Sequence, residues 1–199
     1  MPIGIQQHAS WGQSMLLRSV VGCCALAVSL VAQIAPVKAQ SLAPYVGSPP
    51  SVVERMLELA NLKTGETVYD LGCGDGRILI VAAQKHRVKA VGVELSDRLA
   101  TSTTESLKKL GLSDLASVIH GDLMDVDLSS ADVVTLYLLR DSNDLVRPKL
   151  EKSLHAGARI VSHDYEIRGW RPTAVEHIEA SKRDHKIYVY TVPASFAKK

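Results

Sequence analysis

The stretch Val68 to Ile80 reads VYDLGCGDGRILI, and it decides the fold. A short apolar strand containing the acid Asp70 is followed by three glycines at alternate positions, Gly72, Gly74 and Gly76, and then by a new apolar run. A strand that leads into a glycine-rich turn and a helix places backbone N–H groups beside a ligand at the carboxyl edge of a sheet. Glycine there permits unusual φ values and lets the ligand touch the main chain. The stretch therefore predicts a small-molecule site at a corner between a strand and a helix.

Three classes of ligand compete for such a loop. A P-loop needs a Gly-Lys-Ser/Thr ending, whereas Arg77 and Ile78 follow Gly76 here. The dinucleotide fingerprint needs its third glycine five residues after the first, and Arg77 holds that position. An acid before tight glycines suits a ligand without phosphate that carries a positively charged amino-acid end and a ribose. S-adenosylmethionine is such a ligand.

Two further acids follow the next two expected strands. Glu94 ends the second strand, about twenty residues beyond the loop, where an acid can accept both ribose hydroxyl hydrogens. After the third strand, HGDLMD (120–125) offers Asp122 to the adenine amino group, and Leu123 can pack on the ring. Because the carboxyl ends of parallel strands meet at one edge of a sheet, we expect these residues to lie together.

The rest of the chain alternates between strand and helix patterns. Ser51 and Glu54 form a capping box for a first helix, and the tail 173–192 reads as two strands without a helix between them. The other expected strands cover 68–71, 88–94, 116–120, 133–139 and 158–163, and the other expected helices cover 78–84, 99–110 and 145–154, with Pro148 delaying or bending the last. The pattern predicts an α/β fold with a doubly wound, mostly parallel Rossmann-like sheet and a C-terminal antiparallel hairpin.

Residues 1–39 differ from the remainder of the chain. They contain no acid, and Arg18 precedes an apolar run at 19–35 and small residues before Gln40. This pattern predicts a secretory leader, or an uncleaved anchor because about 17 apolar residues can just cross a bilayer. We expect export or association with a membrane through this segment, with the cytoplasm as the alternative, and a single domain at 40–199.

The charge gives no support for a nucleic-acid partner, and the cysteine content excludes a disulfide framework in residues 40–199. The chain has 23 basic and 21 acidic residues, and its excess comes from Arg18 and Lys38, so residues 40–199 are neutral. A neutral domain without a basic stripe gives no support for a nucleic-acid partner. Cys73 is the sole cysteine after the leader-like segment, which excludes an internal disulfide framework there.

A metal site is not expected, because the histidines show no ligand spacing. We expect His155, His177 and His185 to lie on the surface. His163 and Asp164 have two interpretations, a structural strand end or a general base with its partner.

The stretches YDLGCGDGRILI, VGVEL, GDLMDVDL and VVTLYLL together resemble class I S-adenosylmethionine-dependent methyltransferases. More narrowly, residues 43–62 and 154–172 resemble a branch of small methyltransferases that includes the ATP synthase c-subunit lysine methyltransferases. The resemblance implies that the glycine loop with Asp70 holds the methionine end of the cofactor. It also implies that Glu94 holds the ribose, that Asp122 holds the adenine, and that Tyr45 folds over the cofactor.

The resemblance further implies transfer of a methyl group to an amine, most simply a lysine of a protein. The branch usually has a proline after the fourth strand, where this chain has Arg140, so the acceptor stays open. We expect Arg140 on the surface. The Asn/Asp-Pro-Pro-Tyr ending of glutamine and nucleobase N-methyltransferases is absent, which argues against those acceptors. The alternatives are a small-molecule methyltransferase and a noncatalytic S-adenosylmethionine-binding module.

Methyl transfer from a sulfonium needs alignment and a dry site more than it needs catalytic side chains. An amine must be presented as a neutral nitrogen, and the backbone carbonyls of Tyr137, Leu138 and Leu139 can orient it. These three are the candidate catalytic residues. The ring of Tyr137 either lines the acceptor channel or packs against the core. Trp170 is expected to be a packing anchor.

Overall fold

The computed structural model describes residues 42–196, so the predicted leader or anchor at 1–39 lies outside the described residues. The elements run in the order α1 (Pro50–Leu59), β1 (Thr67–Leu71), α2 (Arg77–Val81), η1 (Ala82–His86), β2 (Lys89–Glu94), α3 (Asp97–Lys109), β3 (Ala116–His120), β4 (Val133–Leu136), α4 (Arg140–Ser153), β5 (Arg159–His163), β6 (Ala174–Ala180), β7 (Arg183–Thr191) and η2 (Ala194–Phe196). Within 42–196, no helix combines the length and apolar character needed to cross a membrane.

Seven strands form one sheet in the order β3-β2-β1-β4-β5-β7-β6. The first five in this order pair in parallel, and β7 runs antiparallel between β5 and β6. The chain leaves β1 toward β2 and β3 and returns to β4 on the other side of β1. The carboxyl ends of β1 and β4 therefore flank a topological switch point, where open α/β sheets bind ligands. The predicted fold, including the C-terminal hairpin, is confirmed.

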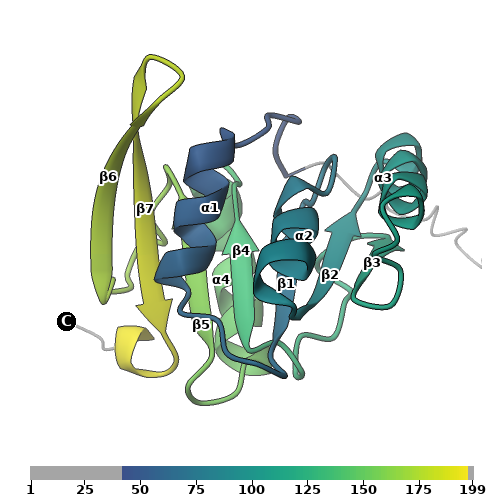
Figure 1. The fold of residues 1–199 in the computed structure, drawn as a ribbon. Helices are drawn as coiled ribbons and strands as arrows, with labels where there is room; N and C mark the ends of the chain where they lie inside the picture. Colours follow the sequence, from purple (N-terminus) through teal and green to yellow (C-terminus); the bar gives the residue numbers. More distant parts are fainter. Residues whose placement is uncertain (1–41, 197–199) are drawn as a thin grey trace, which may run out of the picture. The chain divides into compact units, whose positions relative to one another are not determined.

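Helices cover both faces of the sheet, with α1 and α2 in front and α4 behind in Figure 1. Neighbouring residues of one strand pack into two different cores, one on each face of the sheet. Val68 packs with the helices α1 and α2, whereas Tyr69 packs with Val146 and Leu150 of α4. All four of these residues are buried to at least nine-tenths, as expected for a strand covered on both sides. This explains why the strands read as continuous apolar runs.

The first helix begins differently from the prediction. Its N-cap is Pro49, Pro50 is its first residue, and no side chain caps it, so the predicted capping box at Ser51 is wrong. Proline suits this position because its fixed φ matches the helix and its missing N–H would be unpaired there in any case. The carbonyl of Pro49 accepts the first hydrogen bond, from the N–H of Val53 at 3.0 Å.

The fourth strand and helix also differ from the prediction. The strand ends at Leu136, and α4 begins at Arg140 and continues through Pro148, so the prediction that Pro148 delays the start of this helix is wrong. The buried Asn143 holds the first turn, since its Nδ2 donates to the carbonyl of Tyr165 at 3.0 Å. Arg140 is exposed and pairs with Glu166 at 3.1 Å, which confirms its place on the surface.

The hairpin of β6 and β7 covers the far edge of β5 (Figure 1). Tyr190 is fully buried in β7, and its ring lies 5.6 Å from the ring of Trp170. Trp170 also contacts Phe196 at 4.5 Å and donates from Nε1 to Glu151 at 2.8 Å. The prediction that Trp170 anchors packing is confirmed.

Candidate active site

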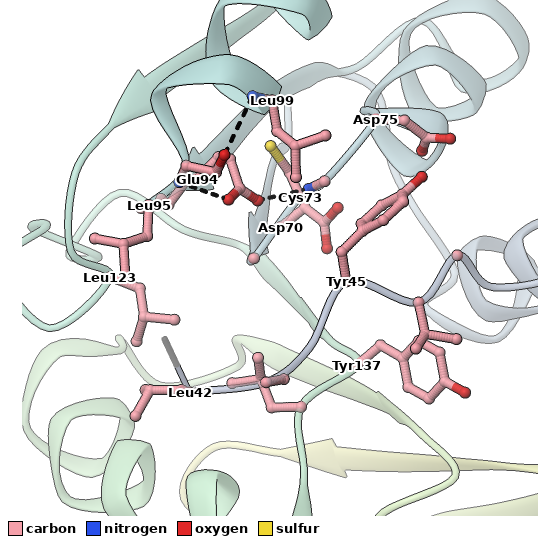
Figure 2. A pocket seen from close by; sticks show the side chains of 18 of the residues that line it. Leu42, Tyr45, Asp70, Cys73, Asp75, Glu94, Leu95, Leu99, Leu123 and Tyr137 are labelled. Carbon is pink, nitrogen blue, oxygen red and sulfur yellow. Dashed lines mark hydrogen bonds between the residues drawn. The ribbon is translucent and has the colours of Figure 1, made fainter. Parts of the chain in front are cut away.

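A cavity of about 330 Å³ lies at the carboxyl ends of β1 and β2. Its volume falls at the lower end of the range for small-molecule sites. Figure 2 shows Asp70, Glu94 and Tyr45 around this cavity, with Leu123 and Tyr137 farther along its wall. The cavity brings together most of the predicted site residues: Tyr45, Asp70, Gly72, Gly74, Glu94, Asp122, Leu123, Tyr137 and Leu138.

Two predicted site residues do not line the cavity. Gly76 is buried at the N-cap of α2, where a Cβ would lie 2.4 Å from Cγ2 of Thr103. Leu139 is 42% exposed and forms the N-cap of α4. Gly76 therefore shapes the loop from behind, and Leu139 lies outside the lining.

Gly74 is the point where the chain needs glycine for both conformation and space. Its φ is +54°, and a Cβ there would lie 2.6 Å from Cε2 of Tyr45. The ring of Tyr45, which is 53% exposed, thus lies directly over the backbone of the loop. Desolvation and the neighbouring Asp75 raise the pKa of Tyr45, so its hydroxyl stays protonated.

Glu94 ties the loop to the end of β2. Its Oε2 accepts the N–H of Gly74 at 2.9 Å, and its Oε1 accepts the N–H of Ser96 at 2.8 Å. Each carboxylate oxygen offers about two acceptor positions, so both oxygens retain capacity for another donor. A carboxylate fixed by backbone donors and lining a cavity is well placed to accept two hydroxyl groups.

Asp70 is the most buried acid of the cavity, at 4% exposed. Its Oδ1 accepts a hydrogen bond from Oγ1 of Thr135 at 2.7 Å. Burial, with smaller contributions from the charges of Glu94 and Asp75, raises the pKa of Asp70 to about 7. A positively charged ligand group would therefore stabilise the ionised form of this carboxyl.

These residues fit S-adenosylmethionine. The cavity offers a buried carboxyl, Asp70, whose ionised form has no cationic partner within residues 42–196, and a fixed carboxylate with spare acceptor positions, Glu94. An ammonium group and a ribose diol match this pair. The pyrophosphate of a dinucleotide would instead lie against the carboxyl groups of Asp70 and Glu94, which both line the cavity.

Opposite the loop, Asp122 and Leu123 follow β3. Asp122 accepts the N–H of Met124 at 2.8 Å, and Leu123 is buried against the core. This pair presents a carboxylate edge and an apolar surface to the cavity, as a planar base requires.

Sequence reasoning missed part of the surroundings of Tyr137. His185 is only 3% exposed and lies within hydrogen-bond distance of His163, so its predicted surface position is wrong. The two histidines come from β5 and β7, and only the antiparallel pairing of these strands makes them neighbours. Ser48 was also missed, and it bonds to His163 across 115 positions of sequence.

The fold together with this pocket defines a class I S-adenosylmethionine-dependent methyltransferase. The family model described as the ANTKMT methyltransferase domain matches residues 70–174. The chain belongs to this family.

Known relatives agree with that assignment. The chain is 47% identical over 150 residues to a protein-lysine N-methyltransferase of Saccharolobus islandicus. The alignment covers 75% of this chain and 93% of that protein. The chain is 32% identical to the adenine nucleotide translocase lysine N-methyltransferase of Mus musculus, over 76% of this chain and 64% of that protein.

A solved structure gives the same result for the fold and cofactor. An RNA methyltransferase from Salinibacter ruber in complex with S-adenosyl-L-homocysteine superposes with a TM-score of 0.71 at 40% identity. The alignment covers 74% of this chain and 94% of that chain. The prediction that S-adenosylmethionine is the cofactor is confirmed.

The raised pKa of Asp70 predicts a pH-dependent stability. A carboxyl whose pKa is higher in the folded than in the unfolded state binds more protons when folded, so its contribution weakens as pH rises from about 4 to about 7. We therefore expect Asp70→Asn to gain stability relative to wild type over this range in the absence of cofactor. Chemical unfolding at several pH values measures the difference, with the exposed Asp114→Asn as control. If the difference in unfolding free energy between Asp70→Asn and wild type stayed constant with pH, Asp70 would have an ordinary pKa.

Proposed function

We propose that the protein transfers the methyl group of S-adenosylmethionine to the side-chain amine of a lysine in a protein substrate. The observation that carries this proposal is the 47% identity to a protein-lysine N-methyltransferase, 93% of which the alignment covers. The match to an adenine nucleotide translocase lysine N-methyltransferase supports the same type of acceptor.

The residues of the cavity would divide the cofactor between them. Asp70 and the loop with Gly72 and Gly74 would hold the methionine end, with Gly76 keeping the loop in shape. Glu94 would bind the ribose hydroxyls, and Asp122 with Leu123 would hold the adenine. Tyr45 would close over the ligand from the lead-in segment. When bound, the cofactor supplies a methyl group already activated by its positively charged sulfur.

The acceptor would approach along the other end of the cavity. Tyr137 and Leu138 line this end, and Leu139 lies just beyond it. Their backbone carbonyls would orient a neutral amine by accepting its hydrogens. Low hydration at this site would lower the pKa of a lysine and so favour the neutral amine.

RNA is the second candidate acceptor, because the 40% identical solved structure is described as an RNA methyltransferase. The charge of the chain favours protein. Outside residues 1–39, acids and bases balance, and a phosphate backbone would find no excess of positive charge.

The acceptor is tested by incubating the full chain with S-adenosylmethionine carrying a labelled methyl group and with total protein and RNA from cells that carry the gene. We expect label in material that protease degrades and nuclease does not, recovered as methyl-lysine. Label released only by nuclease would assign an RNA acceptor. Label found only in small molecules would assign a metabolite, and cofactor binding without any transfer would indicate a noncatalytic module.

For residues 1–39 we propose association with a membrane through the apolar run at 19–35, with export or a cytoplasmic location as the alternatives. The length and apolar character of the run support it. Carbonate extraction of cell membranes would retain an anchored chain, whereas a chain recovered only in the soluble fraction would refute the anchor.

A further inference from the structure

A chain of hydrogen-bonded side chains leads away from the cavity wall. Ser48 lines the cavity, and its Oγ lies 2.8 Å from Nδ1 of His163. Nε2 of His163 lies 2.8 Å from Nδ1 of His185, which in turn lies 3.3 Å from Oδ2 of Asp164. Ser48, His163 and His185 are each less than 5% exposed, so water does not compete for these contacts.

The far end of this chain approaches solvent. The side chain of Asp164 is 11% exposed, and its Oδ2 accepts a hydrogen bond at 2.7 Å from Arg183, which is 55% exposed. Tyr137, a second residue of the cavity wall, reaches the same carboxylate with its hydroxyl at 3.3 Å. Its ring lies 3.9 Å from the ring of His163. Two residues of the cavity wall thus converge on Asp164.

The known donors fix which atom donates in each of these hydrogen bonds. Nη2 of Arg183 lies 3.0 Å from Nδ1 of His185, and a guanidinium group can only donate. We therefore assign Nδ1 of His185 as an acceptor. Nε2–H of His163 then donates to it, and Nδ1 of His163 accepts the hydroxyl hydrogen of Ser48. The hydrogen bonds from Ser48 to His163 and from His163 to His185 then both point away from the cavity, and Arg183 donates to Nδ1 of His185 and to Asp164 from the other side.

The same atoms do not suit a metal ion. His163, Asp164 and His185 have ligand-type atoms within 4.8 Å of one another, but Arg183 places a positive charge against two of these residues. A metal ion would have to displace this guanidinium from Nδ1 of His185 and from Oδ2 of Asp164, both of which it would need as ligands. In addition, Nε2 of His185 is buried and has no hydrogen-bond partner in the described part of the chain, so hydrogen bonds hold only one nitrogen of this ring.

We propose that Ser48, His163, His185 and Asp164 form a relay that removes the proton of the acceptor ammonium group, an inference that rests on the proposed lysine methyltransferase function. The N–H bond of the ammonium breaks, its electron pair stays on nitrogen, and the proton passes to Oγ of Ser48. The hydroxyl proton of Ser48 moves to Nδ1 of His163, and the Nε2 proton of His163 moves to Nδ1 of His185. As Nδ1 of His185 takes the proton, Arg183 keeps only its hydrogen bond to Oδ2 of Asp164, and the new Nδ1–H faces that carboxylate at 3.3 Å, past which the proton leaves to water. A shift of the His163 ring proton from Nδ1 back to Nε2 then returns the relay to its initial protonation state.

The electrostatics fit a group that passes a proton without storing it. Burial lowers the pKa of His163 to about 4, opposed by Asp164 and reinforced by His185 and Arg183, so the ring is neutral at pH 7. Hydrogen bonds and nearby positive charge lower the pKa of Asp164 despite its burial, so the carboxylate stays ionised. The polar and charged groups that face His163 are Ser48 from the lead-in, Tyr137 from the loop after β4, its neighbour Asp164, and His185 and Arg183 from β7.

The relay is tested with full-chain Ser48→Ala and His163→Gln, and with His177→Asn as control because His177 is an exposed histidine of the same hairpin. We expect both relay variants to bind S-adenosylhomocysteine within about twofold of wild type by calorimetry, which also shows that they fold. At pH 7 their kcat on a lysine peptide should fall by about 100-fold, with little change in the KM for the peptide. The loss should shrink toward pH 10, where free lysine approaches its own pKa of about 10.4 and needs no relay. Ser48→Thr, which keeps the hydroxyl, should restore the rate.

Each other outcome has a definite meaning. Wild-type rates in Ser48→Ala and His163→Gln at pH 7 would overturn the relay and leave the proposed function standing. A rate loss that is equal at every pH would also overturn it, because these residues would then only hold the lead-in segment in place. A wild-type chain that methylates no lysine at any pH would overturn the proposed function itself, and the relay with it.

Discussion

Glu94→Ala is expected to weaken binding of S-adenosylhomocysteine by at least about 100-fold. Each hydrogen bond from a ribose hydroxyl to a carboxylate contributes about 1.5–3 kcal/mol, and both would be lost. The substitution also removes the acceptor for the N–H groups of Gly74 and Ser96, which loosens the loop itself. Calorimetric titration of the full chain measures the change. Glu94→Gln keeps one acceptor oxygen and should lose only about tenfold.

The control for this prediction is Glu179→Ala, an acid exposed on the outer strand β6. It removes the same charge far from the loop in sequence and should leave the affinity unchanged. Equal affinity of Glu94→Ala and wild type would mean that the ribose is held elsewhere.

Gly76→Ala is expected to destabilise the protein by roughly 2–5 kcal/mol, the sum of a left-handed backbone strain and an overpacked core. Its φ is +74°, and the new Cβ would lie 2.4 Å from Cγ2 of Thr103. Thr103 cannot simply move aside, because it is buried and its Oγ1 donates to the carbonyl of Gly74 at 2.7 Å. Displacing it would disturb the cofactor loop. Denaturant unfolding measures the loss of stability.

Two variants separate the strain from the clash. Gly111 has a similar φ of +68° with nothing within 4 Å of a Cβ, so Gly111→Ala should cost only about 1–2 kcal/mol. Adding Thr103→Ser to Gly76→Ala removes the clashing methyl group and keeps the hydroxyl, so it should recover part of the stability. If Gly76→Ala cost no more than Gly111→Ala, the packing of Thr103 would not constrain the loop.

The strands and the cofactor loop could be predicted because their signals are local. The runs 68–71 and 116–120 were predicted as strands and agree with the structure within one residue. Asp70 and Glu94 end up in one cavity because both lie near carboxyl ends of adjacent parallel strands, and their spacing alone indicates this.

Features that depend on tertiary packing could not be predicted in the same way. Proline normally ends a helix, yet α4 continues through Pro148 because Val146 and Leu150 on either side of it are fully buried. His185 has no ligand-like spacing, and only the register that places His163 beside Ile187 brings the two histidines together. Tertiary burial overrides local preference at both places.

The most direct test of the site is a crystal structure of the full chain with S-adenosylhomocysteine. The account predicts that both ribose hydroxyls lie within about 2.5–3.0 Å of the carboxylate of Glu94, with the amino group of the ligand against Asp70. A ligand whose ribose contacts other residues, while Glu94 remains bonded only to Gly74 and Ser96, would contradict it.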